Sequence, residues 1–167
     1  MQFSSYSIEP SNQIRSLGFI FDSKLTLSNQ ILSVTKCCYF HLWRIRQLLP
    51  YLDDPSLHLL VSALILSQID YCNSLYYGLP ESVLKPLNTV FNFAARLVSR
   101  SLYHYITPYL ILLHWLPIKY RIIFKISVNM FKLKKLYYPE YLKSLILQPH
   151  RSNFKILYTQ SLFHSLN

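Results

Sequence analysis

Two adjacent carboxylates, Asp53 and Asp54, are the residues whose types and spacing best suit metal-dependent catalysis. Such carboxylates bind Mg2+ when a tight β-hairpin projects them together towards a third one. Here Pro50 precedes the pair and Pro55 follows it, with an amphipathic helix expected on each side. Asp-Asp-Pro-Ser before an apolar run is typical of a helix N-terminus, with Asp54 as the cap and Pro55 at the first helical position. We therefore interpret the pair as structural and expect no catalytic residue and no metal ligand in this chain.

A further carboxylate, Asp70, lies on the small polar strip of a helix that we expect to be buried, because it is apolar nearly all round. An unpaired carboxylate in such a place is costly. A structural salt bridge or a helix-capping bond is favoured over catalysis, since no second carboxylate stands nearby in the sequence. We expect an arginine from a neighbouring helix to be the partner, with Arg96 as the candidate.

Basic side chains form a second group with a chemical implication. Seventeen Lys and Arg against seven Asp and Glu give a net charge of +10, which suits nucleic acid or an anionic membrane. After Pro117 the residues Arg121, Lys125, Asn129, Lys132 and Lys135, four of them cations, recur every three or four positions opposite an apolar face. Such a stripe, about 20 Å long, can follow a phosphate backbone. A merely solvated lysine face explains that stripe equally well. The candidate phosphate contacts are Lys36, Arg44, Arg96, Arg100, Arg121, Lys125, Lys132 and Lys135.

Two aromatic residues, Phe40 and Trp43, share a helix face with basic groups that include Arg44 and Arg46. Aromatic rings among cations on an exposed face can stack on bases or grip a nucleic-acid backbone. The alternative, that both rings pack against a neighbouring helix, is the one we favour.

Helices and strands must position these residues. The spacing of apolar residues along the chain predicts a mainly α-helical bundle of about five helices with a short N-terminal β element. A strand is expected over Ser16–Asp22, paired with residues 2–8 or with a strand outside this chain. Ser28 is the expected cap of the first helix, which ends at Pro50. The expected helices are 28–49, 55–76, 81–102, one after Pro117, and 139–147; the expected regions are 1–27 (β element), 28–147 (helical domain) and 148–167 (loosely ordered tail).

Composition excludes several functions. Two glycines, Gly18 and Gly78, cannot build a Gly-rich phosphate loop. The three cysteines lack zinc-binding spacing, and we expect them to be reduced in a cytoplasmic or nuclear protein. The start does not read as a secretion signal, and the longest uncharged runs with helical character fall short of the roughly 20 residues that span a bilayer.

Several short blocks occur in a specific order between about Ser16 and Ser152. They are Leu17–Ser23, Ile69–Leu75 with Gly78–Pro80, Asn92 with Ala94–Val98, Ile106–Pro108, Leu113–Ile118, Arg121–Ile122 with Phe124–Lys125, and Pro139–Leu142. In order and spacing they resemble the region downstream of the catalytic palm in reverse transcriptases of non-LTR (LINE-type, Jockey-like) retrotransposons.

The resemblance implies a fragment of a right-hand polymerase: the end of the palm, a helical thumb and the start of a C-terminal extension. A thumb holds the template–primer duplex by its backbone. The implied partners are an RNA–DNA or DNA duplex and the palm and fingers of the same polyprotein, with no small-molecule substrate. The Mg2+-binding carboxylates would belong to the parent palm, so this chain alone would not be an enzyme. Gly78, Pro80 and Trp115 are expected to be structural, as is Asp70.

Some residues depart from the family pattern. The family usually has a basic residue where Gln68 stands and a smaller one at Phe93, as in a decaying or truncated element copy. The residues Tyr51–Asp54 match the Tyr-x-Asp-Asp signature of reverse-transcriptase active sites. Because prolines flank them, we interpret the match as a coincidence of sequence and not as an active site. Two alternatives stay open: a small, basic, membrane-associated helical protein, and an untranslated or decayed relic with no function.

Overall fold

The structure is a computed structural model that describes residues 11–100 and 105–135. The chain divides into two compact units, Met1–Ser127 and Val128–Asn167. The expected helix at 139–147, the tail at 148–167 and the proposed strand partner at 2–8 lie outside the described residues.

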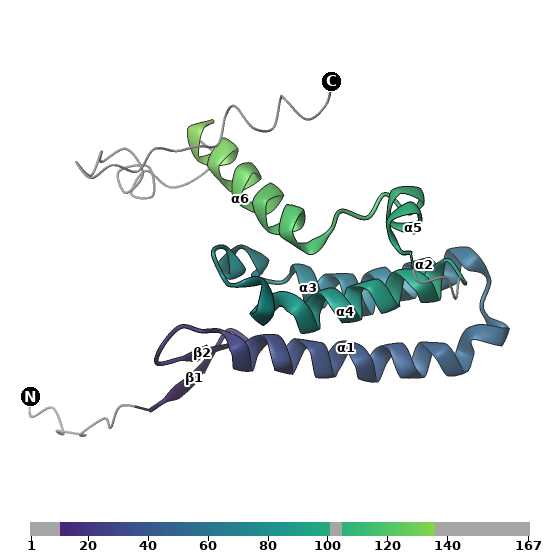
Figure 1. The fold of residues 1–167 in the computed structure, drawn as a ribbon, viewed down its shortest axis with the longest axis horizontal. Helices are drawn as coiled ribbons and strands as arrows, with labels where there is room; N and C mark the ends of the chain where they lie inside the picture. Colours follow the sequence, from purple (N-terminus) through teal and green to yellow (C-terminus); the bar gives the residue numbers. More distant parts are fainter. Residues whose placement is uncertain (1–10, 101–104, 136–167) are drawn as a thin grey trace, which may run out of the picture. The chain divides into compact units, whose positions relative to one another are not determined.

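The fold class is the expected one, mainly α-helical with a short N-terminal β-sheet (Figure 1). A π-helical stretch (η2) joins α2 to α3, so that the two form one continuous helix with a local widening. The elements are β1 Gln13–Ser16, β2 Phe19–Asp22, α1 Ser28–Leu48, η1 Leu49–Tyr51, α2 Asp54–Val61, η2 Ser62–Leu66, α3 Ser67–Asp70, η3 Asn73–Tyr76, α4 Glu81–Val98, α5 Thr107–Leu112 and α6 Ile118–Lys134.

The N-terminal β element is an antiparallel hairpin in which Ser16 pairs with Phe19. Its two turn residues, Leu17 and Gly18, have φ angles of 50° and 82°, as the tightest hairpin turns require. The single strand expected over Ser16–Asp22 is therefore wrong, because the chain reverses in the middle of it. Its partner is β1, and neither residues 2–8 nor a strand outside the chain is needed for this pairing.

The chain enters α1 through a loop that the Asp22 carboxylate organises. It accepts hydrogen bonds from the Thr26 amide at 2.8 Å, the Thr26 hydroxyl at 2.9 Å and the Leu27 amide at 2.8 Å. These bonds, that of the Thr26 amide foremost, hold the pKa of the Asp22 carboxyl below its usual 3.8. The helix cap expected at Ser28 is wrong: Leu27 precedes the first turn, and no side chain caps it.

The hairpin is held against α1 by Gln30, which is buried in the first turn of the helix. Its side-chain carbonyl accepts a hydrogen bond from the Ile20 amide at 2.9 Å. On the other side of the turn, the Tyr71 hydroxyl donates to the Leu17 carbonyl at 2.5 Å. A two-stranded sheet is marginal alone, and here Gln30 and Tyr71 each satisfy one backbone group of the hairpin.

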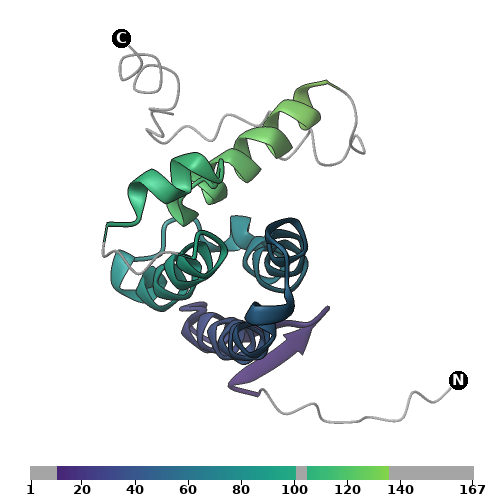
Figure 2. The same cartoon turned by 90° about the vertical axis from the view of Figure 1, so that its right-hand side faces the viewer.

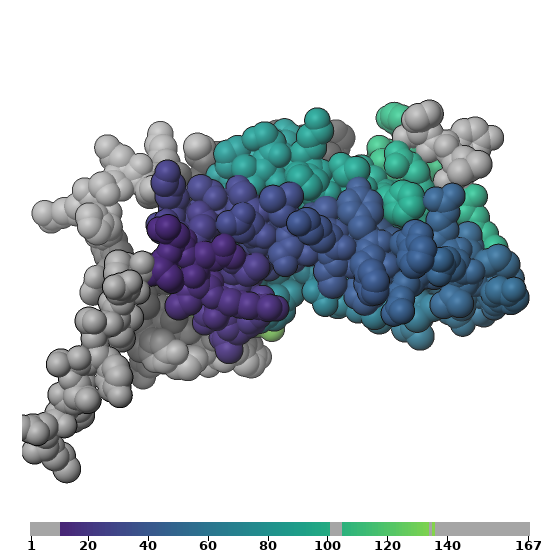
Figure 3. Space-filling view, turned by 90° about the horizontal axis from the view of Figure 1, so that it is seen from below, coloured from purple at the N-terminus to yellow at the C-terminus, as the bar shows by residue number. Residues whose placement is uncertain are grey.

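The core lies among α1, the α2–α3 helix and α4, which appear nearly end on in Figure 2. Apolar residues that recur every three or four positions along α1 are buried from Ile31 to Ile45, as are most of those along one face of α4. Burying each such side chain stabilises the fold by about 1.5–3 kcal/mol. The opposite side of α1 forms the surface shown in Figure 3, with the hairpin at its N-terminal end. The buried residues facing one another are Ile31, Val34, Cys38, Leu42, Ile45, Val61, Ile65, Ile69, Leu87, Val90 and Ala94.

The second predicted helix is shorter than expected. It ends at Asp70 and not at Tyr76, because Cys72 takes a left-handed conformation with φ of 52°. The η3 turn that follows buries the Tyr76 ring 6.0 Å from the Phe19 ring of the hairpin. Tertiary burial therefore overrides the helical pattern at this point.

Two other helix boundaries also differ from expectation. The residue before α2 is Asp53, not Asp54, and it makes no capping hydrogen bond. Helix α4 ends at Val98 and not at residue 102, and the Ser99 hydroxyl donates to the Ala95 carbonyl at 2.8 Å.

Candidate nucleic-acid interface

The outer face of α1 carries four exposed residues of the expected kind: Lys36, Phe40, Trp43 and Arg44. The expectation that Phe40 and Trp43 pack against a neighbouring helix is wrong. The buried stripe of α1 already meets both partner helices, so the two rings face outward. The Arg44 guanidinium lies over the Phe40 ring, 5.0 Å from its centroid.

Helix α6 carries the candidate cations Lys125 and Lys132, Lys135 directly follows the helix, and all three are exposed. The Lys135 ammonium lies 5.9 Å from the centroid of the Phe131 ring. Neither α1 nor α6 contains an Asp or a Glu. The exposed cations of each helix therefore have no carboxylate on their own helix to neutralise them.

Arg121, also on α6, is placed differently from its neighbours in the predicted stripe. Its guanidinium donates to the Asp70 carboxylate, donates to the Leu116 carbonyl at 2.9 Å, and lies 5.5 Å from the centroid of the Phe91 ring. Asn73 donates to the other Asp70 oxygen at 3.2 Å. Arg121 is thus held inside a polar cluster and is not an exposed phosphate contact.

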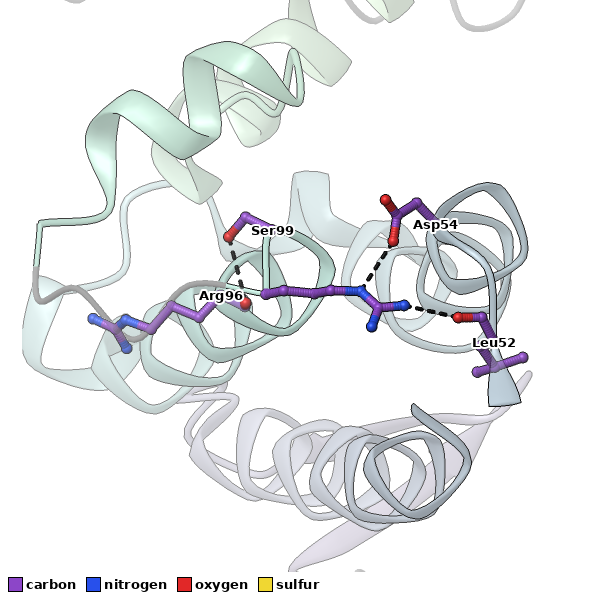
Figure 4. Close-up of polar contacts among 5 residues, drawn as sticks. Leu52, Asp54, Arg96 and Ser99 are labelled. Atoms are coloured by element: carbon purple, nitrogen blue, oxygen red, sulfur yellow. Dashed lines mark hydrogen bonds and ion pairs between the residues drawn. The ribbon is translucent and has the colours of Figure 1, made fainter. Parts of the chain in front are cut away.

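The prediction that Asp70 bonds internally to an arginine is confirmed, but the partner named from the sequence is wrong. Arg121 takes this position because the buried Ile118 and Ile122 hold the first turns of α6 against the core. Arg96 is half-buried on α4, and its side chain points away from Asp54 and Leu52 (Figure 4).

Arg100 is also occupied by protein groups. Its Nε donates to Asp54 at 3.0 Å and its Nη2 donates to the Leu52 carbonyl at 2.7 Å (Figure 4). Arg100 therefore ties the end of α4 to the start of α2. Both side chains of the pair are well exposed, so the ion pair adds little stability.

The Asp53–Asp54 pair lies where a 3-10 turn passes into α2, and not on a β-hairpin. Its interpretation as a helix N-terminus is confirmed. Within the described residues, no group of three or more His, Cys, Asp and Glu side chains is arranged to hold a metal ion.

Gly78, Pro80 and Trp115, which we expect to be structural, lie in a turn, at a helix start and in the core, respectively. Gly78 has a φ of 81° in the turn before α4, where a side chain would be strained, and Pro80 directly precedes that helix. Trp115 is buried, with its ring 5.6 Å from Phe91 and 5.8 Å from His58.

All three cysteines are free thiols. Cys38 is fully buried on the inner stripe of α1, and burial raises the pKa of its thiol to about 12. Cys37 and Cys72 are half-buried.

Two exposed lysines that add to the positive charge of the candidate interface were not among the residues predicted from the sequence. Lys119, in the first turn of α6, is exposed beside the predicted stripe, and Lys24 is exposed in the loop before α1. Only the overall charge excess pointed to them, since neither belongs to a periodic pattern.

No protein-family model, curated protein or solved structure matches the chain. The resemblance to non-LTR reverse transcriptases therefore rests on its ordered sequence blocks and stays a prediction.

Proposed function

We propose that this chain is a non-catalytic, thumb-like part of a retrotransposon reverse transcriptase and holds a template–primer duplex by its phosphates. The observation that carries the proposal is the pair of basic helices without carboxylates, α1 and α6. Among the described acidic residues, Asp54 and Asp70 are each paired with an arginine, and Asp22 accepts hydrogen bonds within its own loop. The positive charge of the two helices is thus left for an outside polyanion.

The proposed phosphate contacts are Lys36 and Arg44 on α1, Lys125 and Lys132 on α6, and Lys135 directly after α6. The two α1 residues are about 12 Å apart along the helix axis. Side chains spaced in this way meet successive parts of a phosphate backbone, which carries a negative charge about every 1.7 Å along a duplex. Arg100 and Arg121 are left out, because protein groups occupy their guanidinium groups, and Arg96 is left out because it is half-buried.

The expected binding is independent of nucleotide sequence. Contacts to phosphates fix orientation but carry no sequence information. An RNA–DNA hybrid also has grooves that side chains read poorly. The resemblance assigns the catalytic Mg2+ ions to palm carboxylates outside this chain.

Fluorescence anisotropy with two blunt RNA–DNA hybrids of unrelated sequence tests this proposal. We expect dissociation constants in the nanomolar-to-micromolar range that agree within about threefold. A preference of tenfold or more, which corresponds to about 1.4 kcal/mol, would contradict binding through the backbone.

A membrane surface is the second candidate, because several large apolar side chains of α5 and α6 are exposed, among them Ile111, Leu112 and Phe124. A basic, partly apolar helical surface can lie on anionic lipid. No helix among the described residues is long and apolar enough to cross a bilayer. Flotation with phosphatidylserine vesicles, in the presence and absence of excess hybrid, separates the two: lipid binding that the hybrid does not displace would favour the membrane.

A further inference from the structure

The outer face of α1 exposes two large aromatic side chains. Phe40 is 52% exposed and Trp43 is 60% exposed. Three residues apart on a helix, they project from the same side. Figure 3 shows the surface of α1 on this side of the molecule. The two rings contribute little to the core, and phosphate contacts alone do not explain them.

Cations flank both rings. Lys36 is one turn before Phe40, and the Arg44 guanidinium lies 5.0 Å from the centroid of the Phe40 ring, next in sequence to Trp43. We call these four residues, Lys36, Phe40, Trp43 and Arg44, the α1 stacking face. Flat rings among cations suit unpaired nucleotides, whose bases stack on the rings while their phosphates meet the charges.

A duplex makes fewer such contacts, because its bases are already stacked on one another and are not free to stack on the two rings. Only Lys36 argues against a protein partner, because lysine is depleted at protein interfaces whereas aromatic residues and arginine are enriched there.

We propose that the α1 stacking face binds the unpaired nucleotides of a single-stranded extension beside the duplex. The bases stack on Trp43 and Phe40, and Lys36 and Arg44 contact the phosphates. The inference rests on the proposed function for the class of ligand and adds to it a second, single-stranded part of that ligand.

The chain contains its own probe for this contact. It has two tryptophans, and Trp43 is exposed whereas Trp115 is only 6% exposed. A base stacked on Trp43 quenches the fluorescence of that residue and leaves Trp115 nearly unaffected. The test titrates the full chain with a 12-nucleotide oligothymidylate strand and with an abasic strand of the same length, which keeps the phosphates but lacks the bases. We expect quenching and tight binding with the first, and weak binding without quenching with the second.

Variants locate the contact. We expect Trp43→Ala to bind the oligothymidylate strand roughly 5- to 100-fold more weakly, the range for loss of one stacked base. Trp43→Tyr keeps a ring and retains most of the affinity. The control Tyr51→Ala removes an aromatic side chain that is 87% exposed outside the face and should bind as the unchanged chain does. All three variants should bind a blunt hybrid within about threefold of the unchanged chain.

The inference is overturned if the abasic strand binds as tightly as oligothymidylate, or if Trp43→Ala leaves single-strand affinity unchanged. It is also overturned if the chain forms a dimer that Trp43→Ala dissociates, because the face would then join two copies. In each case, continued binding of the blunt hybrid leaves the proposed function standing. Failure to bind any of these nucleic acids contradicts both.

Discussion

The guanidinium of Arg121 binds the carboxylate of Asp70, although 51 residues separate them in the chain. Each residue alone suggests another role, Asp70 as a catalytic acid and Arg121 as a phosphate contact. Together they neutralise each other, and the contact joins the end of α3 to the start of α6. The pair therefore belongs to the architecture of the fold.

A double-mutant cycle tests this pairing. We expect Asp70→Asn and Arg121→Met each to lower the free energy of unfolding by roughly 1 to 2 kcal/mol. The cost is below that of a fully buried pair because the Asp70 side chain is 39% exposed and that of Arg121 is 17% exposed. The double variant should lose less than the sum of the two, as measured by urea unfolding. Strictly additive losses would show that the two side chains do not interact.

Gln30 should contribute more to the stability of the fold than an uncharged polar side chain usually does. Gln30→Leu leaves the Ile20 amide without its acceptor and should lower the free energy of unfolding by about 1–3 kcal/mol. The Ile20 amide should also exchange its hydrogen faster. The matched control is Gln47→Leu on the exposed side of α1, where we expect a change within about 0.5 kcal/mol. If the two substitutions lower the free energy of unfolding equally, the hydrogen bond from the Ile20 amide to Gln30 does not stabilise the fold.

Asp22 should give the fold an acid-sensitive contribution. Its pKa is lower in the folded chain than the usual 3.8, so the carboxylate favours the folded state above that pH. This contribution is lost as the pH falls below 3.8 through the folded pKa. The unchanged chain should therefore be more stable than Asp22→Asn at pH 6, with a gap that narrows below pH 4 in thermal melts. A gap independent of pH would argue against the Asp22 hydrogen bonds.

The thiols should differ in reactivity. Because the pKa of Cys38 is about 12 and its side chain is buried, it has almost no thiolate at pH 8. In native protein, iodoacetamide should modify Cys37 and Cys72 before Cys38, and in urea all three should react alike. Mass spectrometry of the peptides measures this order, and early alkylation of Cys38 in native protein would contradict its burial.

The sequence predicted the helical class and the inner stripes because periodic burial is a property of each helix alone. Ile31, Leu42 and Leu87, for example, lie at helical spacing among apolar residues and are buried. The hairpin was missed because its turn begins with Leu17, which rarely adopts the positive φ that such a turn needs.

Other errors concern relations between elements. The helix break after Asp70 follows from the burial of Tyr76 against the hairpin, which periodicity does not encode. The choice between Arg96 and Arg121 depends on how α6 packs against α3. The exposure of Phe40 and Trp43 likewise depends on which sides of α1 its neighbours occupy.

The salt dependence of hybrid binding tests the central claim most directly, that α1 and α6 hold a nucleic-acid backbone. Between 50 and 200 mM salt we expect the logarithm of the binding constant to fall with the logarithm of salt concentration, with a slope of about −3 to −5 for the five proposed cations. The Lys36→Gln/Lys125→Gln double variant should have a slope smaller in magnitude by about 2. Arg121→Met, which removes an occupied arginine, should keep the original slope. Hybrid binding that ignores salt, or a double variant with an unchanged slope, would contradict the claim.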